Sequence, residues 1–186
     1  MQSFTVVLDA NVIVPMVAAD ILMRLAERDL YRPVWSNRIL DETRRTVLKL
    51  HPELTEGQVE RRLSYMNDAF EDALVTGWEH LEDSVTLPDP NDRHVLACAI
   101  VSGADAIVTN NVKDFPAEGL KPFGIESIRL DDFLLDIIDH VPDQVVEVIR
   151  ELVRDSERPP LTTAEVLSSL AAAGAPSSAR ELDPLV

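Results

Sequence analysis

Strand-like segments alternate with helix-like segments over the first 130 residues, and this alternation is what most constrains the fold. Residues 4–8 (FTVVL) form a short β-branched run that predicts a buried strand. Further strands are expected at 33–35, 106–109 and 127–130, and the segments between them place apolar residues at helical spacing. Such alternation predicts an α/β fold, with a mainly parallel central sheet and helices on both faces.

Capping residues predict where several of the helices begin and end. Residues 18–29 have helical spacing, and Ser36 is a good N-cap for a helix that runs to about Leu50. Gly103 is expected to end the helix after the loop LPDPND, because glycine readily adopts the left-handed conformation that closes many helices. Another amphipathic helix is predicted with five apolar residues on one face, namely Val59, Leu63, Met66, Phe70 and Leu74.

The strand pattern stops at about residue 131. Three helices are predicted after it, at 131–139, 144–153 and 163–173, and the last dozen residues are rich in Ala, Ser and Pro. We therefore expect an α/β domain at 1–130, followed by a C-terminal helical extension at 131–186 that ends in a loose tail.

Composition excludes several classes of protein. The 46% hydrophobic content is sufficient for a packed core, yet no apolar run reaches membrane-spanning length. The N-terminus does not have the pattern of a cleavable signal, so we expect a cytoplasmic protein without membrane contact. Cys98 is the single cysteine, so no internal disulfide is possible and a structural zinc site is not expected.

The formal net charge of −16 is distributed unevenly along the chain. Residues 1–65 hold nine basic and nine acidic side chains, whereas residues 66–186 hold eight basic and 24 acidic ones. A polyanion would have to approach the first part, and the acidic second part would suit a basic protein partner. The alternative is that the acidic surface serves only solubility.

Four acidic residues, Asp9, Glu42, Asp92 and Asp114, stand where strands end or helices begin. In a parallel α/β fold these positions gather at the carboxyl ends of the strands. Clustered carboxylates repel one another unless a cation binds them, so the set predicts a divalent-metal site. Taken singly, Asp9 could be an ordinary helix cap and Asp114 an ordinary surface acid.

Glu42 lies on the border between the apolar face of its predicted helix and a basic stripe formed by Arg38, Arg45 and Lys49. This position would let its carboxylate reach a cleft while the basic residues face a ligand there. The alternative is a solvated helix face on which Arg38 pairs with Glu42, at a gain of about 0.3–0.5 kcal/mol.

Asp92 falls on the same helical face as three apolar residues, Val95, Leu96 and Ala99. An acid on an inward face is costly unless a cation or a hydrogen bond compensates it. Asp92 could instead only complement the helix dipole, which contributes roughly 0.3–1 kcal/mol. Asp89, which precedes a proline, is expected to be a cap rather than a ligand.

The segments VVLDANV, ILDETRR, DPNDRHVLACA and IVTNNVKDF, in this order, resemble the PIN domain, and within it the VapC-type toxins. The resemblance covers about residues 4–130 and implies a three-layer α/β/α fold. It implies that Asp9, Glu42 and Asp92 are metal-binding acids. The helices after residue 131 resemble an extension found in some of these toxins.

Three polar residues have supporting roles by the same resemblance. Asn11 matches the small polar residue that supports the first acid, and Thr109 matches the hydroxyl residue that ends a strand before the fourth acid. Many family members have an acid where this chain has Asn111, and Asp114 resembles an alternative acid of this loop. The fourth ligand is therefore either Asp114 or Asn111, and Asn110 suits the turn between them and the strand.

The resemblance implies a metal-dependent endoribonuclease with Mg²⁺ or Mn²⁺, acting as the toxin of a toxin–antitoxin pair. Transfer RNA is the expected substrate class, a cognate antitoxin the expected partner, and a homodimer is possible. Arg38, Arg45 and Lys49 could contact RNA phosphates.

Two alternatives remain beside this interpretation. A degenerate PIN module could bind RNA or a protein partner without cutting. A phosphatase of the haloacid dehalogenase type also begins with an Asp after a strand, but it needs a second Asp where this chain has Asn11.

Overall fold

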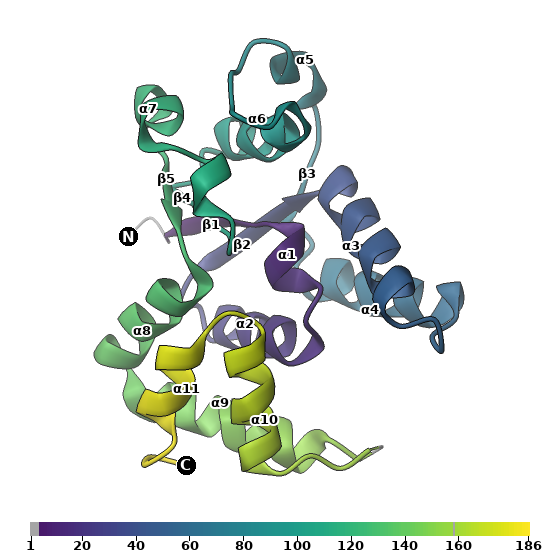
Figure 1. Cartoon of the computed structure of the whole chain (residues 1–186), viewed down its shortest axis with the longest axis vertical. Helices are drawn as coiled ribbons and strands as arrows, with labels where there is room; N and C mark the ends of the chain where they lie inside the picture. The colour runs from purple at the N-terminus through teal and green to yellow at the C-terminus, as the bar shows by residue number, and fades with distance from the viewer. Residues whose placement is uncertain (1–3, 158) are drawn as a thin grey trace.

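Five parallel strands form the central sheet, in the order β3-β2-β1-β4-β5 (Figure 1). The computed structural model describes residues 4–157 and 159–186, so residues 1–3 of the predicted first domain and Arg158 lie outside the described residues. The strands are β1 (Thr5–Leu8), β2 (Arg32–Ser36), β3 (Leu74–Val75), β4 (Ala106–Val108) and β5 (Glu126–Ile128).

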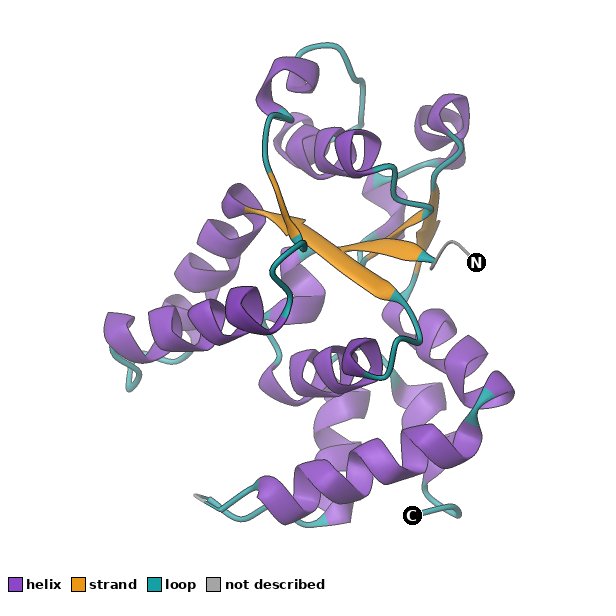
Figure 2. Cartoon of the chain, turned by 180° about the vertical axis from the view of Figure 1, so that it is seen from behind, coloured by secondary structure: helices purple, strands orange, loops and turns teal. Residues whose placement is uncertain are grey.

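Helices cover both faces of this sheet (Figure 2). The α-helices are α1 (Ala10–Ile13), α2 (Met16–Glu27), α3 (Asn37–Leu50), α4 (Glu56–Ala69), α5 (Glu79–Glu82), α6 (Arg93–Ser102), α7 (Ala117–Leu120), α8 (Leu130–His140), α9 (Pro142–Asp155), α10 (Thr163–Ala172) and α11 (Pro176–Leu182). Short 3-10 turns are η1 (Pro90–Asp92), η2 (Val112–Asp114) and η3 (Lys121–Phe123). Helix α6 contacts strands on one face and α2 lies on the other, which confirms the predicted α/β/α arrangement (Figure 1).

The central strand β1 is buried along its whole length. Val6, Val7 and Leu8 have no solvent exposure, as expected of a parallel strand that is covered on both faces. Val7 pairs with Val34 of β2 and with Ile107 of β4, so this run lies in the middle of the core. The position of β1 fixes where Asp9, the next residue, leaves the sheet.

Local capping signals were read correctly from the sequence. The Ser36 side chain accepts a hydrogen bond from the amide of Ile39 at the start of α3, and Gly103 ends α6 with a φ of 62°. The predicted amphipathic helix is α4, whose buried residues include Val59 and Leu63.

The end of that amphipathic face was predicted wrongly. Phe70 is the C-cap of α4, and Leu74 belongs to the two-residue strand β3, which was not expected. The main chain turns after Ala69, so the helical spacing of Phe70 and Leu74 does not continue as a helix. The strand predicted at 127–130 also ends earlier, because α8 begins at Leu130.

The predicted loose tail is wrong, because residues 176–182 form the helix α11. Pro176 occupies its first turn, and Ser178, Ala179 and Leu182 are buried. The amides of Ser177 and Ser178 donate to the carboxylate of Asp131 at 3.0 and 2.8 Å. This long-range cap compensates for a helix that is too short to be stable by itself.

Helices α9 and α10 of the extension pack against α2, whereas α8 packs against α9 and α11, and α11 packs against α8 and α10 (Figure 1). Arg24 of α2 lies 2.9 Å from Asp155, and Arg28 lies 2.7 Å from Glu151 on α9. Buried apolar residues of α9, α10 and α11 join the same core as the sheet. Within the described residues, no helix is both long and apolar enough to cross a membrane.

Candidate functional site

Asp9 lies at the point where β1 and β4 end side by side. Its amide donates to the carbonyl oxygen of Val108 at 3.1 Å, and its carboxylate accepts from the amide of Ala10 at 2.7 Å. Asp9 is thus the N-cap of α1, and only 7% of its surface is exposed. The cap interpretation is correct, but a cap alone does not require this depth of burial.

Two side chains hold the Asp9 carboxylate in one orientation. The hydroxyl of Thr109 donates to Asp9 Oδ2 at 2.7 Å, and Asn11 Nδ2 donates to the same oxygen at 2.5 Å. Together with the Ala10 amide, three donors occupy most of the acceptor positions of this carboxylate. The structure therefore brings Asn11 and Thr109 to the first acid.

Burial raises the pKa of Asp9 above its ordinary value. Hydrogen bonds from Thr109 and Ala10 oppose that shift, the charge of Glu42 adds to it, and His94 acts against it. Glu42 of α3 and His94 of α6 are therefore near enough to Asp9 to act on its charge. A buried acid with a raised pKa in a polar cluster is typical of functional sites.

Glu42 of α3 is half-buried and approaches His94 of α6. His94 Nε2 lies 3.0 Å from Glu42 Oε1, but the contact does not have the angle of a hydrogen bond, so within the described residues both ring nitrogens lack a hydrogen-bond partner. His94 has no solvent exposure and its ring lies 5.9 Å from that of Trp78. Sequence reasoning missed His94, although a histidine inside the apolar run HVLACA was a usable signal.

The basic stripe on α3 is only partly free. Arg38 Nη1 lies 2.6 Å from Glu82 of α5 and its Nε lies 3.8 Å from Glu42, so this guanidinium bridges two carboxylates. Arg45 is exposed and donates to the Asp41 carbonyl oxygen of its own helix at 3.3 Å. Lys49 is exposed at the end of α3. The pair of Arg38 with Glu42 that the solvated-face alternative expected is present, and contact of the stripe with a ligand stays a prediction.

Asp92 ends the 3-10 turn η1 directly before α6, and it makes no capping hydrogen bond to that helix. Burial is the largest of the effects that raise the pKa of Asp92 to about 6. Repulsion from Asp9, Asp89 and Asp114 adds to the shift, and His94 opposes it. The net electrostatic effect of the neighbouring charged groups on Asp92 is therefore repulsive.

Asp89 has the capping role that the sequence predicted. Its carboxylate accepts from the amide of Asn91 at 2.9 Å, and Pro90 follows it. The cap opens the 3-10 turn, however, and α6 begins only at Arg93.

Asp114 and Asn111 lie together in the loop after β4. The Asn111 amide group donates to Asp114 Oδ2, and the Asn111 backbone amide donates to the Thr109 hydroxyl at 3.0 Å. The two residues therefore form one unit beside the first acid.

The acidic site, defined as Asp9, Glu42, Asp92 and Asp114, offers oxygen ligands of the kind that Mg²⁺ and Mn²⁺ prefer. Over residues 4–157 and 159–186, no three His, Cys, Asp or Glu side chains are arranged closely enough to hold an ion by themselves. Mg²⁺ usually keeps several water ligands and takes only one or two carboxylates. Burial raises the pKa values of Asp9 and Asp92, and neighbouring carboxylates add to both shifts, so a bound cation would favour the ionised form of each.

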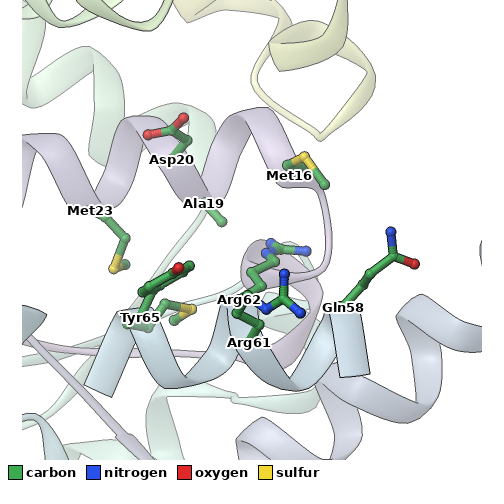
Figure 3. A pocket seen from close by; sticks show the side chains of 9 residues that line it. Met16, Ala19, Asp20, Met23, Gln58, Arg61, Arg62 and Tyr65 are labelled. Atoms are coloured by element: carbon green, nitrogen blue, oxygen red, sulfur yellow. The ribbon is translucent and has the colours of Figure 1, made fainter. Parts of the chain in front are cut away.

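A separate cavity of about 430 Å³ lies between α2 and α4 (Figure 3). Met16 and Met23 line it from α2, and Tyr65 and Arg62 line it from α4 (Figure 3). None of its lining residues belongs to the acidic site.

One residue of that cavity supports the acidic site from behind. Arg62 donates to the carbonyl oxygens of Ile13 and Val14, at the end of α1. Burial lowers the pKa of Arg62, and Asp20 partly offsets this. Because Asp9 caps the other end of α1, Arg62 fixes the short helix that Asp9 begins.

Two known protein-family models match the chain. Residues 5–113 match the family model described as PIN domain, and residues 130–184 match the one described as VapC50 C-terminal domain. The first match alone covers more than half of the sequence, and the chain belongs to the PIN-domain family. The C-terminal helices correspond to the region matched by the second model.

Part of the chain is also similar to a curated protein. A protein of Mycobacterium tuberculosis (strain ATCC 25618 / H37Rv) called "Putative ribonuclease VapC50" is 43% identical to the chain over 79 residues. The match covers 42% of this chain and 47% of the relative, so it spans about half of that protein. The resemblance to VapC-type PIN domains is thereby confirmed. No solved structure matched the chain.

Proposed function

We propose that this protein is a metal-dependent endoribonuclease that acts as the toxin of a toxin–antitoxin pair. Its reaction would be hydrolysis of RNA phosphodiester bonds, with transfer RNA as the substrate class. The PIN-domain family and the name of the M. tuberculosis relative support a ribonuclease.

The observation that carries the proposal is the state of Asp9 and Asp92. Asp9 is almost fully buried and oriented by three hydrogen-bond donors at the carboxyl end of the central strand. The pKa of Asp92 is raised to about 6 by burial and by the charges of Asp9, Asp89 and Asp114. Keeping two such carboxylates together costs stability, and a bound divalent cation would reverse that cost.

Asp9 and Asp92 would hold Mg²⁺ or Mn²⁺ directly or through water, and Glu42 and Asp114 would complete the site. When bound, the metal lowers the pKa of a coordinated water and stabilises charge that develops on the phosphate. Other residues of the chain orient these carboxylates. Thr109 and Asn11 fix Asp9, while Asn111 holds Asp114 in place.

The surface of α3 is the proposed approach for the RNA backbone. Arg45 and Lys49 are exposed on the helix that carries Glu42, and they could contact phosphates. Arg38 would have to leave Glu82 to do the same. Its proposed role is therefore shared between RNA contact and positioning of Glu42.

A cognate antitoxin is the proposed protein partner. A basic side chain of that partner could neutralise the acidic site, and the excess of acidic residues in 66–186 would favour a basic surface. Native electrophoresis of the co-expressed pair tests this, and two separate bands would contradict it. Size-exclusion chromatography with light scattering tests the proposed homodimer, and a monomer mass would contradict it.

Cleavage of total transfer RNA by the purified protein tests the function. The wild-type protein is compared with and without EDTA, in Mg²⁺ or Mn²⁺, beside Asp9→Ala. We expect metal-dependent cutting that is lost in EDTA and in the variant. A folded protein, free of antitoxin, that cuts neither transfer RNA nor ribosomal RNA would overturn the proposal.

The second candidate is a PIN module that binds RNA or a protein without cutting. Two observations favour it: Asn111 stands where many family members have an acid, and no three-ligand cluster exists among the described side chains. Such a module would shift the mobility of RNA in the presence of metal but produce no new RNA ends.

A further inference from the structure

The C-terminal extension contacts the loop of the acidic site through one turn. Asn110 follows Thr109, and its side-chain amide donates to the carbonyl oxygen of Ala173 at 2.8 Å. Ala173 is the C-cap of α10, where the last carbonyl groups of a helix have no partner within the helix. Asn110 therefore supplies a donor to an otherwise orphaned carbonyl group, more than sixty residues away in sequence.

The next residue of the turn, Gly174, packs so closely against Asn110 that there is no room for a side chain at position 174. A Cβ atom at position 174 would lie 2.6 Å from Asn110 Oδ1 and 2.8 Å from its Cγ, which is closer than van der Waals contact permits. Gly174 also has a φ of 104°, a conformation that side chains rarely adopt. The backbone of the turn and the Asn110 amide are thus packed face to face.

From Asn110 a continuous series of hydrogen bonds reaches the first acid. The backbone amide of Asn110 donates to Asn11 Oδ1 at 2.9 Å, and Asn11 Nδ2 donates to Asp9 Oδ2. Asn11 Nδ2 also lies 2.9 Å from the Thr109 hydroxyl. A displacement of Asn110 would therefore also shift Asn11 and Thr109, the two side chains that orient Asp9.

The turn between α10 and α11 is itself held firmly. The amides of Gly174 and Ala175 donate back to carbonyl groups of α10, and Ala175 is completely buried. On the other side, Asp131 caps α11 through Ser177 and Ser178. In Figure 1 this turn is the part of the yellow segment that points toward the centre of the molecule.

Asp131 connects this anchor to the sheet. It lies in the first turn of α8, directly after β5, and β5 pairs with β4. Although burial raises the pKa of Asp131, hydrogen bonds from Ser178 and Ser177 hold it below its ordinary value. The acceptor is therefore ionised at neutral pH, as a charge-assisted cap requires.

We propose that the turn at 173–175 is a positioning element of the acidic site: it fixes Asn110, and through Asn110 the segment that carries Asn111 and Asp114. The extension would then be a working part of the catalytic centre and not only a covering of α2. The catalytic consequence rests on the proposed nuclease function, whereas the structural consequence does not.

Substitutions in the full-length chain separate positioning from simple stabilisation. Gly174→Ala introduces both strain and a clash with Asn110. Gly103→Ala is the matched control, because Gly103 also has a positive φ of 62° but nothing lies within 4 Å of a Cβ there. Asn110→Ala removes the contact without strain in the turn, and serves if Gly174→Ala does not fold.

Two readouts are needed, and one of them requires neither metal nor RNA. Amide hydrogen exchange in metal-free protein is followed at Asn110 and Asn111, whose amides donate to Asn11 and Thr109. We expect Gly174→Ala and Asn110→Ala to speed exchange at both amides at least about tenfold, while Gly103→Ala leaves them at the wild-type rate.

The second readout is RNA cleavage. A misplaced loop should lower kcat by about 10- to 100-fold with little change in KM, as for residues that orient metal ligands. The double variant Asn110→Ala with Gly174→Ala should have the kcat of Asn110→Ala alone, because without the asparagine side chain neither the clash nor the strain at position 174 is transmitted to the acidic site. Gly103→Ala should keep the wild-type kcat even where its Tm falls.

Each outcome decides a separate statement. Unchanged exchange at Asn110 and Asn111 in both test variants would overturn the positioning role, whatever the activity. Faster exchange with an unchanged kcat would overturn its catalytic consequence. A wild-type protein that cuts no RNA would instead contradict the proposed function, and the exchange rates would still test the inference.

Discussion

Asp9 and Asp92 both belong to the acidic site, and the charge of Asp9 helps to raise the pKa of Asp92, yet their surroundings differ greatly. Asp9, on the strand side, accepts three hydrogen bonds and is almost fully buried. Asp92, on the helix side, makes no capping hydrogen bond, and burial together with the charges of other carboxylates raises its pKa. The strand side is therefore preorganised before any ligand arrives, whereas the helix side would gain its compensation from the ligand.

This difference separates two tasks that a metal site must perform. A fixed carboxylate defines where an ion binds, and a carboxylate that is destabilised without the ion makes binding favourable. The helix side also includes His94, whose ring nitrogens lack hydrogen bonds within the described structure, beside Glu42.

Asp9→Asn should have the largest effect on cleavage. The substitution keeps the shape of the side chain but removes its charge from the preorganised side, so we expect the cleavage rate to fall by at least about a hundredfold. Initial rates of transfer RNA cleavage in Mn²⁺ measure it. Asp132→Asn, at an exposed acid of α8, is the control, and an equal loss there would contradict a special role of Asp9.

Thr109→Val should lower the free energy of unfolding by about 1 to 3 kcal/mol. The hydroxyl is fully buried, donates to Asp9 and accepts from the Asn111 amide, so valine leaves buried polar groups without partners. Urea denaturation in metal-free buffer measures the change. Thr43→Val is the matched control, because that buried hydroxyl only donates to a carbonyl oxygen of its own helix, and we expect a smaller loss.

Asp92→Asn should stabilise the metal-free protein, and increasingly so as the pH rises. The pKa of Asp92 is about 6 in the folded protein against an ordinary value of 3.8, so folding favours the protonated form. The wild-type protein therefore loses stability as the pH rises through 6, while the asparagine variant does not. Between pH 5 and 7.5 we expect the difference to grow by about 1 kcal/mol after allowance for solvent exposure.

Urea denaturation at pH 5, 6 and 7.5 in the presence of EDTA checks the sign. Saturating Mn²⁺ should reverse the order, because only the wild-type protein would gain binding free energy. An asparagine variant that is less stable than the wild type at every pH would show that Asp92 is compensated by the protein itself.

Lys49→Ala should have the smallest effect. If Lys49 contacts one phosphate, the slope of log K against log salt concentration for RNA binding should decrease by about 0.7. Lys121→Ala, an exposed lysine of η3, is the control. Equal slopes in the wild type and Lys49→Ala would reduce the basic stripe to a solvated helix face.

The parts of the fold that could be predicted are those that depend on local chemistry. β1 and the cap at Ser36 follow from a few neighbouring residues, as does the helix end at Gly103. β3 could not be predicted, because two residues carry no period and the strand exists only through pairing with β2. Helix α11 was missed for a related reason, since its cap is Asp131, far away in sequence.

The acidic site and its surroundings also contain residues that could be predicted from the sequence and residues that could not. The acids could be chosen because strand ends and helix starts are visible in the sequence, and Asn11 and Thr109 came from the family resemblance. The position of His94 in an apolar run is visible in the sequence, but its contact with Glu42 is not, because α3 brings Glu42 to within 3.0 Å only in the folded protein. The contact of Asn110 with Ala173 depends on how the extension folds back, which no local pattern encodes.

Calorimetric titration of the metal-free protein with Mn²⁺ at pH 7.5, without RNA, tests whether Asp9 and Asp92 together form one metal-binding site. Wild-type protein, Asp9→Asn and Asp92→Asn are compared, each in two buffers of different ionisation enthalpy, so that proton release can be detected. The account predicts saturable binding to the wild-type protein and its loss in both variants, because the two sides form one site. Binding that persists unchanged in either variant, or no binding to the wild-type protein, would contradict it.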